Sequence, residues 1–381
     1  MDFELSEEER LIQETAREFA RDVVEPAAAR TDQEARFPAE VIARMRELGF
    51  LGMTVPAEYG GAGMGNVALS LLLIELNRAC ASTGVIVSVH NSLVCGPLAR
   101  FGNEDQKRRY LPRLASGEWL GAYALTEPEA GSDAGNQQTV AVRRGDEWEL
   151  TGTKIFITTG KEAGFYIVFA RTVPGSHGPD GVSAFLVERT TPGLQVTREE
   201  EKMGIRGSST MTMVLDGCRV PDANLLGEEA KGFSIAMDTL NGGRIGIACQ
   251  AVGIAEGCLD ASLKYAKDRE QFGKKIGEFQ AIQWKLADMA TKLEAARLLT
   301  LKAAWLRDRG HNPIIECSMA KLFASEAANW AAREAVQVHG GAGYLKDFPV
   351  ERYFRDARIT EIYEGTSEVQ RLVIARQLLR R

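Results

Sequence analysis

The sequence predicts an α+β fold with an N-terminal α-helical domain, a middle antiparallel β-barrel or sandwich, and a C-terminal four-helix bundle. Apolar residues recur at helical spacing in the first part of the chain, short β-rich runs broken by Gly, Asp and Pro follow, and long helix-forming segments return near the end. A chain of 381 residues is also too long for one ordinary hydrophobic core. We therefore predict three domains, over residues 1–120, 121–228 and 229–381.

The first segment has the pattern of a series of helices. Ser6 and Glu9 have the spacing of a capping box, and the helix that they begin is expected to end at Pro26. Pro38 opens a second helix, which Gly49 ends. Three further helices are predicted, over roughly residues 67–81, 84–100 and 104–115.

The middle segment has the pattern of short strands. A first strand leads into Tyr123, and further runs follow at Trp148–Leu150, Lys154–Thr159, Phe165–Ala170, Val182–Val187, Leu194–Thr197 and Met211–Leu215. Because turn signals separate these runs so often, a small barrel or sandwich is favoured over βαβ units.

The last segment returns to helices. Residues 274–309 are predicted to be mostly helical, and Pro313 allows a further helix through Ala335. A final helix follows Gly365, where Ser367 and Gln370 have the spacing of a capping box. Long helices joined by short links predict a bundle.

The composition excludes several classes of protein. The chain has 46 basic and 52 acidic residues, a net charge of −6, so it has no basic footprint for nucleic acid. No apolar run approaches membrane-spanning length, and the acidic start is unlike a targeting peptide, so we expect a cytoplasmic protein without membrane insertion. The scattered Cys and His residues predict no metal site. The absence of GxGxxG, GxxxxGK[ST] and GxSxG disfavours Rossmann and P-loop enzymes and a nucleophile elbow.

Two polar segments of the middle region could bind a cofactor. In Tyr123–Asp133, backbone donors and the hydroxyls of Thr126 and Ser132 could hold a ring edge and a pyrophosphate, or the segment could be only a polar turn. Phe156 and Thr158 lie two apart, and so on one face of a strand, where they could line a flat ring. An amphipathic edge strand explains this pair equally well.

A third polar segment lies near the C-terminus, where Glu364 precedes Gly365 at the start of the last helix. A carboxylate buried there against an apolar ligand would have a raised pKa, as a base for an α-proton needs. The alternative is a solvated loop residue, or an acid favoured by the helix dipole.

Together with Arg269–Gly273, Phe279-Gln280 and Gln337–Gly341, these segments resemble the acyl-CoA dehydrogenase family over essentially the whole chain. The resemblance implies that the cofactor is FAD and that the catalytic residue is Glu364. It implies cofactor contacts from Tyr123, Ala124, Leu125, Thr126, Gly131, Ser132, Phe156, Ile157, Thr158, Arg269, Phe272, Gln280, Gln337, Val338, His339, Gly340, Gly341, Thr366 and Glu368. It implies substrate contacts from Ser132, Asn241, Arg244 and Gly365.

The reaction that the resemblance implies is the α,β-dehydrogenation of a short-chain acyl-CoA, such as butyryl-CoA, to trans-2-enoyl-CoA. Glu364 takes the α-proton, flavin N5 takes the β-hydride, and the electrons pass to electron-transferring flavoprotein. The implied assembly is a homotetramer, a dimer of dimers. In it, Arg269, Phe272, Gln280 and the loop Gln337–Gly341 hold the FAD of a neighbouring subunit.

Gly243 marks a choice within the family. Some branches carry the base immediately before the substrate-binding arginine, but a glycine cannot act as a base, so the resemblance assigns that role to Glu364. Two alternatives are an acyl-CoA oxidase or related flavoenzyme on the same scaffold and, more distantly, a non-catalytic helical binding protein. Retention of Glu364 argues against the second.

Overall fold

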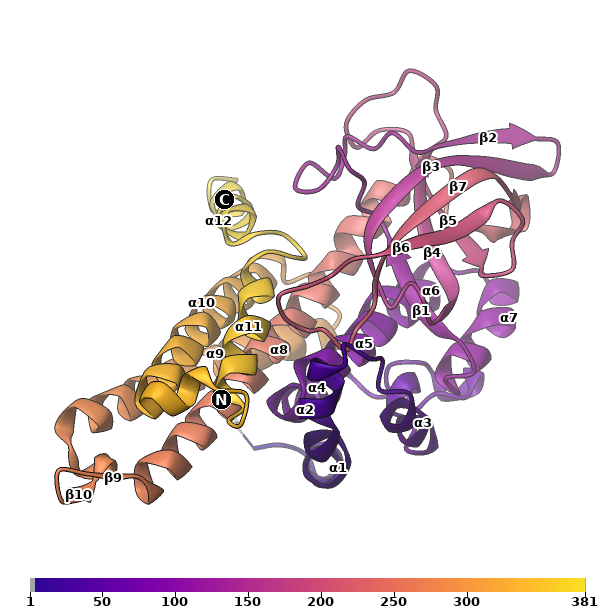
Figure 1. Cartoon of the computed structure of the whole chain (residues 1–381). Helices are drawn as coiled ribbons and strands as arrows, with labels where there is room; N and C mark the ends of the chain where they lie inside the picture. Colours follow the sequence, from indigo (N-terminus) through magenta and orange to yellow (C-terminus); the bar gives the residue numbers. More distant parts are fainter. Residues whose placement is uncertain (1–3, 381) are drawn as a thin grey trace.

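The computed structural model describes residues 4–380, which form a helical, a β and a second helical region in that order (Figure 1). In this view the N-terminal helices lie below the β domain, and the C-terminal helices extend away from both toward the lower left. This order confirms the predicted fold class. Within the described range, no helix combines the length and apolar character needed to cross a membrane.

The N-terminal domain is built from helices and short helical turns. They are α1 (Glu7–Phe19), η1 (Ala20–Val24), α2 (Glu25–Gln33), α3 (Ala39–Glu47), η2 (Phe50–Gly52), η3 (Ala57–Tyr59), α4 (Asn66–Ala79), α5 (Ala81–Ser88), η4 (Val89–Cys95), α6 (Gly96–Phe101) and α7 (Glu104–Ala115). The predicted capping box forms at α1, where Glu9 N donates to Ser6 Oγ at 3.2 Å and Ser6 N donates to Glu9 Oε2 at 2.8 Å.

The predicted end of the first helix at Pro26 is wrong, because the chain stays helical to Gln33. The π-helical turn η1 precedes the proline, and the Glu25 N–H bonds back to the carbonyl of Ala20. Pro26 therefore stands at the start of α2, directly after a π turn that changes the hydrogen-bonding pattern of the helix, and the helix continues past it.

The middle domain is a twisted sheet. Its strands are β1 (Leu120–Ala124), β2 (Val140–Arg144), β3 (Glu147–Thr158), β4 (Ala163–Arg171), β5 (Val182–Glu188), β6 (Leu194–Glu199), β7 (Thr210–Pro221) and β8 (Leu225–Leu226). They are ordered β6-β7-β3-β2-β4-β5-β8, with β1 beside β4. Since β1 and β2 pair in parallel with β4, the sheet is mixed rather than wholly antiparallel.

The C-terminal domain contains the longest helices. Its elements are α8 (Gly232–Asp268), β9 (Glu270–Gln271), β10 (Lys274–Lys275), η6 (Ile276–Glu278), α9 (Gln280–Asp308), α10 (Ile314–His339), η7 (Gly340–Tyr344), α11 (Val350–Arg358), η8 (Ile359–Glu361) and α12 (Ser367–Leu378). The predicted helix start at 274 is wrong. Phe272 (φ 54°) and Gly273 (φ 78°) are both left-handed, as the two-residue turn of a β-hairpin requires, so β9 and β10 pair and α9 begins only at Gln280.

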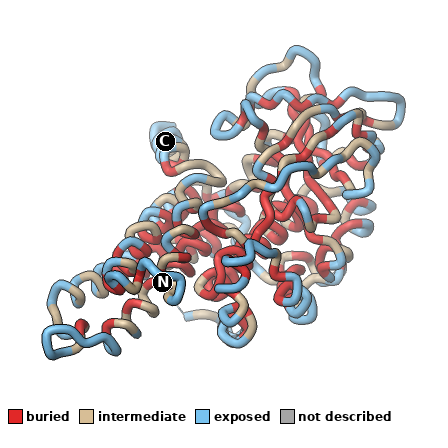
Figure 2. Tube along the Cα trace, in the orientation of Figure 1, coloured by how far each residue is buried: buried red, intermediate tan, exposed pale blue. Residues whose placement is uncertain are grey.

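The main hydrophobic core joins the two helical domains and one face of the β sheet, where it includes Phe165, Ile167 and Phe169 of β4. Figure 2 shows buried residues concentrated where α4 and α5 pack against α8, while the outer end of the bundle is exposed. The β domain has a second core, which includes Trp148, Tyr166 and Phe185. We propose domain limits at 120/121 and 228/229, close to the start of β1 and in the connection from β8 to α8.

Candidate functional site

Glu364 lies in the short segment between η8 and α12, in an unusual backbone conformation. Its φ is 52° and that of Gly365 is 91°, so two successive residues are left-handed. For a residue with a Cβ this costs about 1–3 kcal/mol and needs support from its surroundings. Lys321 Nζ donates to the Gly365 carbonyl at 2.8 Å, and Gln370 Nε2 donates to the carbonyls of Glu364 at 3.1 Å and Gly365 at 3.0 Å. Buried side chains from α10 and α12 therefore hold this turn.

The predicted capping box at Ser367 and Gln370 is wrong. The N-cap of α12 is Thr366, whose Oγ1 accepts a hydrogen bond from the Val369 N–H at 3.3 Å. The side chain of Gln370 is turned toward the Glu364 carbonyl instead. The spacing from Ser367 to Gln370 is the same whether the glutamine side chain caps the helix or binds the Glu364 carbonyl. The sequence alone therefore could not distinguish these two roles.

The carboxylate of Glu364 has the electrostatic character of a base. Its Oε2 is buried and has no hydrogen-bond partner among residues 4–380. Burial raises the pKa of Glu364 to about 7, against the opposing positive charges of Lys321 and Arg244. Near neutral pH this group can therefore both accept and release a proton.

A pair of buried polar residues on α8 faces the same site. Arg244 Nη1 donates to Asn241 Oδ1 at 2.8 Å, and Asn241 Nδ2 donates to Asn312 Oδ1 at 3.1 Å. Arg244 is only 6% exposed, and its Nε has no partner in the described part of the chain. Burial lowers the pKa of this guanidinium, although the nearby Cys317 and Glu364 raise it. A fixed, desolvated cation with a free donor is suited to binding a ligand's polar group.

Tyr123 lies near the end of β1. Its hydroxyl is buried without a partner within the described residues, and burial, with a smaller contribution from the charge of Glu364, raises its pKa well above the usual value. The structure therefore brings together Tyr123, Asn241, Arg244, Glu364 and Gly365, which the sequence placed in three different domains or segments.

Lys321 belongs to the same site, although no motif of the sequence indicates it. It is fully buried, and burial lowers its pKa to about 8 while Glu364 raises it. One signal was available, since Lys321 is flanked by Ala320 and Leu322 within a predicted helix of apolar and small residues. A lone lysine on such a face needs a buried partner.

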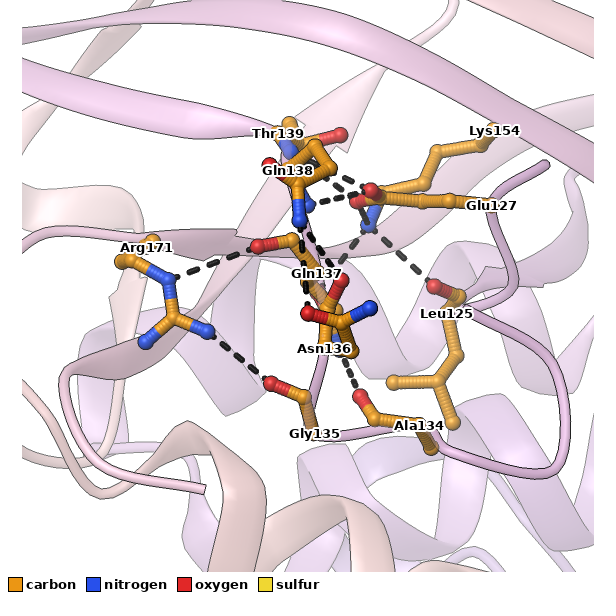
Figure 3. Close-up of polar contacts among 10 residues, drawn as sticks. All are labelled: Leu125, Glu127, Ala134, Gly135, Asn136, Gln137, Gln138, Thr139, Lys154 and Arg171. Carbon is orange, nitrogen blue, oxygen red and sulfur yellow. Dashed lines mark hydrogen bonds and ion pairs between the residues drawn. The ribbon is translucent and has the colours of Figure 1, made fainter. Parts of the chain in front are cut away.

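Figure 3 shows how the segment after β1 is attached to β3. The Nζ of Lys154 donates to Glu127 Oε1 at 2.6 Å, to the Leu125 carbonyl at 3.2 Å and to Gln137 Oε1 at 3.1 Å. Glu127 also accepts from the backbone N–H of Thr139 at 3.1 Å. Both charged groups are buried, so the ion pair is desolvated and geometrically demanding.

The same attachment shapes the two segments predicted to bind a cofactor. The Ile155 N–H donates to the Thr126 carbonyl at 2.9 Å, and β3 has an irregular register between Lys154 and Ile157. At this bulge Phe156 takes a φ of 59° and is 61% exposed. Bulges redirect side chains near functional sites. Half-exposed Thr126 and exposed Phe156 thus come from two segments joined by a hydrogen bond.

Some predicted cofactor contacts have buried side chains. Ala124 and Ile157 point into the core of the β domain, so only their backbone groups remain for a ligand. Leu125 is also mostly buried, whereas Thr158 is half-buried and Gly131 and Ser132 are exposed.

The remaining predicted contacts near α12 and in the helical domain fall into two groups. Thr366 and Glu368 are beside Glu364, at the start of α12. A separate cluster lies around the β9–β10 hairpin, at the end of the bundle far from the β domain (Figure 1). Its exposed members are Arg269, Phe272, Gln280, Gln337, Gly340 and Gly341. Within one chain, this second cluster is not part of the Glu364 site.

Two members of the loop beyond α10 are structural within the chain. Val338 packs against Ala266 and Ile276. His339 Nδ1 is 2.8 Å from the Ala335 carbonyl, and its ring stacks on Tyr265 with centroids 4.3 Å apart. Burial lowers the pKa of this histidine.

Family comparisons agree with this arrangement across the chain. Models of the N-terminal, middle and C-terminal domains of acyl-CoA dehydrogenase match residues 6–118, 122–218 and 230–379. The chain belongs to the acyl-CoA dehydrogenase family. This acyl-CoA dehydrogenase is 52% identical over 377 residues to the mitochondrial short-chain specific acyl-CoA dehydrogenase of Mus musculus, covering 99% of this chain and 91% of that one.

Solved structures share the fold of this chain over its whole length. Butyryl-CoA dehydrogenase from Megasphaera elsdenii superposes with a TM-score of 0.97 at 43% identity, with complete coverage of both chains. A chain in a structure of the electron transferring flavoprotein of Acidaminococcus fermentans superposes with a TM-score of 0.98 at 48% identity, again with complete coverage.

Family membership confirms the predicted enzyme class, a flavin-dependent oxidoreductase, and the predicted cofactor, FAD. The residues present fit such a group. Phe156 offers an exposed aromatic face, Thr126 a half-exposed hydroxyl, and a Cβ built on Gly131 would meet no atom within 4 Å in the described structure, leaving space for close approach. The unpartnered Tyr123 hydroxyl is a further group that a ligand could bind.

Proposed function

We propose that this acyl-CoA dehydrogenase converts a short-chain acyl-CoA to trans-2-enoyl-CoA with Glu364 as its catalytic base. Acyl-CoA dehydrogenation follows from the family. The observation that supports the base is its buried, unpartnered carboxylate oxygen with a pKa near 7. A base of this kind is matched to neutral pH, where it can take a proton and return it to solvent.

The proposed chemistry assigns a task to each group around the substrate. Glu364 accepts the proton from the α-carbon, while its backbone N–H binds the thioester oxygen on which negative charge develops. Arg244, held by Asn241, is the proposed polar contact for the substrate. FAD, when bound, supplies the hydride acceptor for the β-carbon. Exclusion of water from the reacting carbon is part of the same proposal, and the buried Oε2 of Glu364 supports it.

For the cofactor we propose two sets of contacts. Leu125, Thr126, Phe156 and Thr158 line the flavin ring, Ser132 contacts the pyrophosphate and the CoA, and Thr366 and Glu368 complete the contacts from α12. The second set is the exposed cluster around the β9–β10 hairpin, which serves the FAD of a neighbouring subunit. Its distance from the β domain within one chain supports a contribution in trans.

We further propose a homotetramer, built as a dimer of dimers. Large apolar side chains are exposed along the C-terminal helices and the hairpin, as expected of a surface that packs against another copy. They include Phe272, Trp284, Leu298, Trp305, Met319, Phe323, Leu372 and Leu378. A cytoplasmic location is part of the same proposal.

The base is tested by Glu364→Gln in the FAD-loaded enzyme. On anaerobic mixing with butyryl-CoA, the flavin absorbance of the wild type should bleach rapidly, and the variant should bleach roughly 10²–10⁴-fold more slowly. Glu326→Gln is the matched control, because that carboxylate pairs with Arg371 and is not among the groups that act on Glu364 or Lys321. Near-wild-type bleaching by Glu364→Gln with intact substrate binding would disprove the assignment.

The electron acceptor separates a dehydrogenase from an oxidase. We propose electron-transferring flavoprotein, which is supported by the family and by the likeness to a chain in a structure of that protein. Turnover with butyryl-CoA should be slow in air and restored by electron-transferring flavoprotein or a dye. Hydrogen peroxide production in air at the dye-coupled rate would instead support the oxidase.

A further inference from the structure

Lys321 of α10 contacts the base-carrying turn directly. Its Nζ donates to the Gly365 carbonyl at 2.8 Å, and its side chain is completely buried. A buried ammonium is costly unless it is hydrogen-bonded and near a negative charge. Glu364, one residue before the bonded carbonyl, is the negative group with the largest influence on Lys321. Both requirements are thus met by the proposed catalytic segment.

Gln370 of α12 is an uncharged residue that binds the same Gly365 carbonyl as Lys321. Its Nε2 donates to the carbonyls of Glu364 and Gly365 at 3.1 and 3.0 Å, and it too is completely buried. The left-handed turn therefore has two side-chain supports, of which only Lys321 brings a charge. Removing each support in turn can separate hydrogen bonding from electrostatics.

Few other charged and titratable groups lie around Lys321 and Glu364 in the described structure. Those that act on Glu364 or Lys321 are Tyr123 of β1, Arg244 of α8, Glu361 and Tyr363 of the preceding turn, and Glu368 of α12. Arg244 is the second cation near Glu364, but it is oriented by Asn241, and its contribution to the pKa of Glu364 is smaller than that of Lys321.

We propose that Lys321 is a positioning residue for dehydrogenation, which holds the Gly365 carbonyl and by its charge keeps Glu364 ionised for proton abstraction near neutral pH. The inference rests on the proposed role of Glu364 as the base. Proton abstraction requires an ionised Glu364, because only the ionised carboxylate can take the α-proton. A nearby cation favours the ionised form of a carboxylate and a neutral residue does not, and the Lys321 ammonium is held next to the Glu364 segment by its bond to the Gly365 carbonyl.

The test compares four variants of the FAD-loaded enzyme across pH. Lys321→Met removes the hydrogen bond and the charge, Lys321→Gln keeps a donor but no charge, and Lys321→Arg keeps the charge. Gln370→Met removes only neutral hydrogen bonds. The measurements are the pH profile of kcat/KM with butyryl-CoA and the titration of the Glu364 carboxyl by infrared difference spectroscopy against Glu364→Gln.

Both uncharged Lys321 variants should move the acidic limb of the profile upward by roughly one pH unit or more, and the infrared titration should move with it. Lys321→Arg should return the limb to the wild-type position, and Gln370→Met should lower kcat without moving it. Should Lys321→Met not fold, Lys321→Gln still decides the matter. A wild-type limb and titration in Lys321→Gln would overturn the inference. Full activity in Glu364→Gln would instead overturn the proposed base, a separable result.

Discussion

The carboxylate of Glu364 occupies the space in which residue 243 would carry a side chain. A Cβ built on Gly243 would lie 1.8 Å from Glu364 Oε2 and 2.8 Å from Leu93 Cδ2. A residue with a side chain at position 243 would therefore collide with the carboxylate of the proposed base. The two residues are more than a hundred positions apart in the chain.

Gly243→Ala should displace the Glu364 carboxylate and lower kcat by about 10²-fold, the scale expected for a misplacement of about 1 Å. The helix itself should tolerate alanine, which has a higher helix propensity than glycine. Gly242→Ala is the matched control, since its Cβ would be 3.7 Å from the Arg307 guanidinium, an ordinary contact. Steady-state kinetics and thermal melting of both variants check this, and wild-type kcat in Gly243→Ala would contradict it.

Activity should depend on pH through Glu364. Because the pKa of this group is about 7 and only its ionised form is a base, kcat/KM should fall about tenfold for each pH unit below that value and level off above it. A pH profile with butyryl-CoA and an artificial acceptor measures this. A profile that is flat from pH 5 to 8, under conditions where chemistry limits the rate, would be inconsistent with the assignment.

The raised pKa of Glu364 should also make the stability of the folded protein decrease as the pH rises. Folded Glu364 holds its proton more tightly than the unfolded chain, so its contribution to stability is fully present below the unfolded pKa, about 4.3, and is lost as pH rises through about 7. Glu364→Gln should therefore gain in melting temperature relative to wild type as pH increases from 5 to 8. An equal difference at both pH values would argue against a desolvated carboxylate.

The buried pair of Lys154 and Glu127 should show strong coupling. Lys154→Met leaves Glu127 as an unpaired buried charge and should cost about 3–5 kcal/mol of unfolding free energy. Adding Glu127→Gln removes that charge, so the double variant should be less destabilised than the sum of the two single variants. Denaturant titrations of the three variants test this coupling, and strict additivity would exclude it.

The hairpin should link assembly to cofactor binding. Phe272 is 94% exposed in the single chain. If it packs on a neighbouring subunit, Phe272→Ala should lower both the tetramer fraction and FAD retention, because the two equilibria are linked. Sedimentation with absorbance at the flavin band measures both at once. Leu11→Ala, at a 63% exposed leucine of α1, serves as control, and unchanged assembly in Phe272→Ala would count against the proposal.

The helical elements were predictable because their signals are local. The capping box at Ser6 and the stop at Gly49 depend on residues within one or two turns, and both are found in the structure. The error at Pro26 arose because a π turn changes which N–H groups need partners, and no residue type marks such a turn. The hairpin at Phe272 was missed because a phenylalanine with positive φ contradicts its usual preference.

The order of the domains, the family and the identity of the proposed base could be predicted from the amino-acid sequence, because hydrophobic periodicity, caps and short motifs each depend on residues that are close together along the chain. The surroundings of that base could not be predicted, because they are formed by contacts between segments far apart in the chain. The fit of Glu364 against Gly243, the contact of Lys321 with Gly365 and the buried Tyr123 hydroxyl each join distant segments. Desolvation and the resulting pKa depend on such long-range packing, which no local pattern encodes.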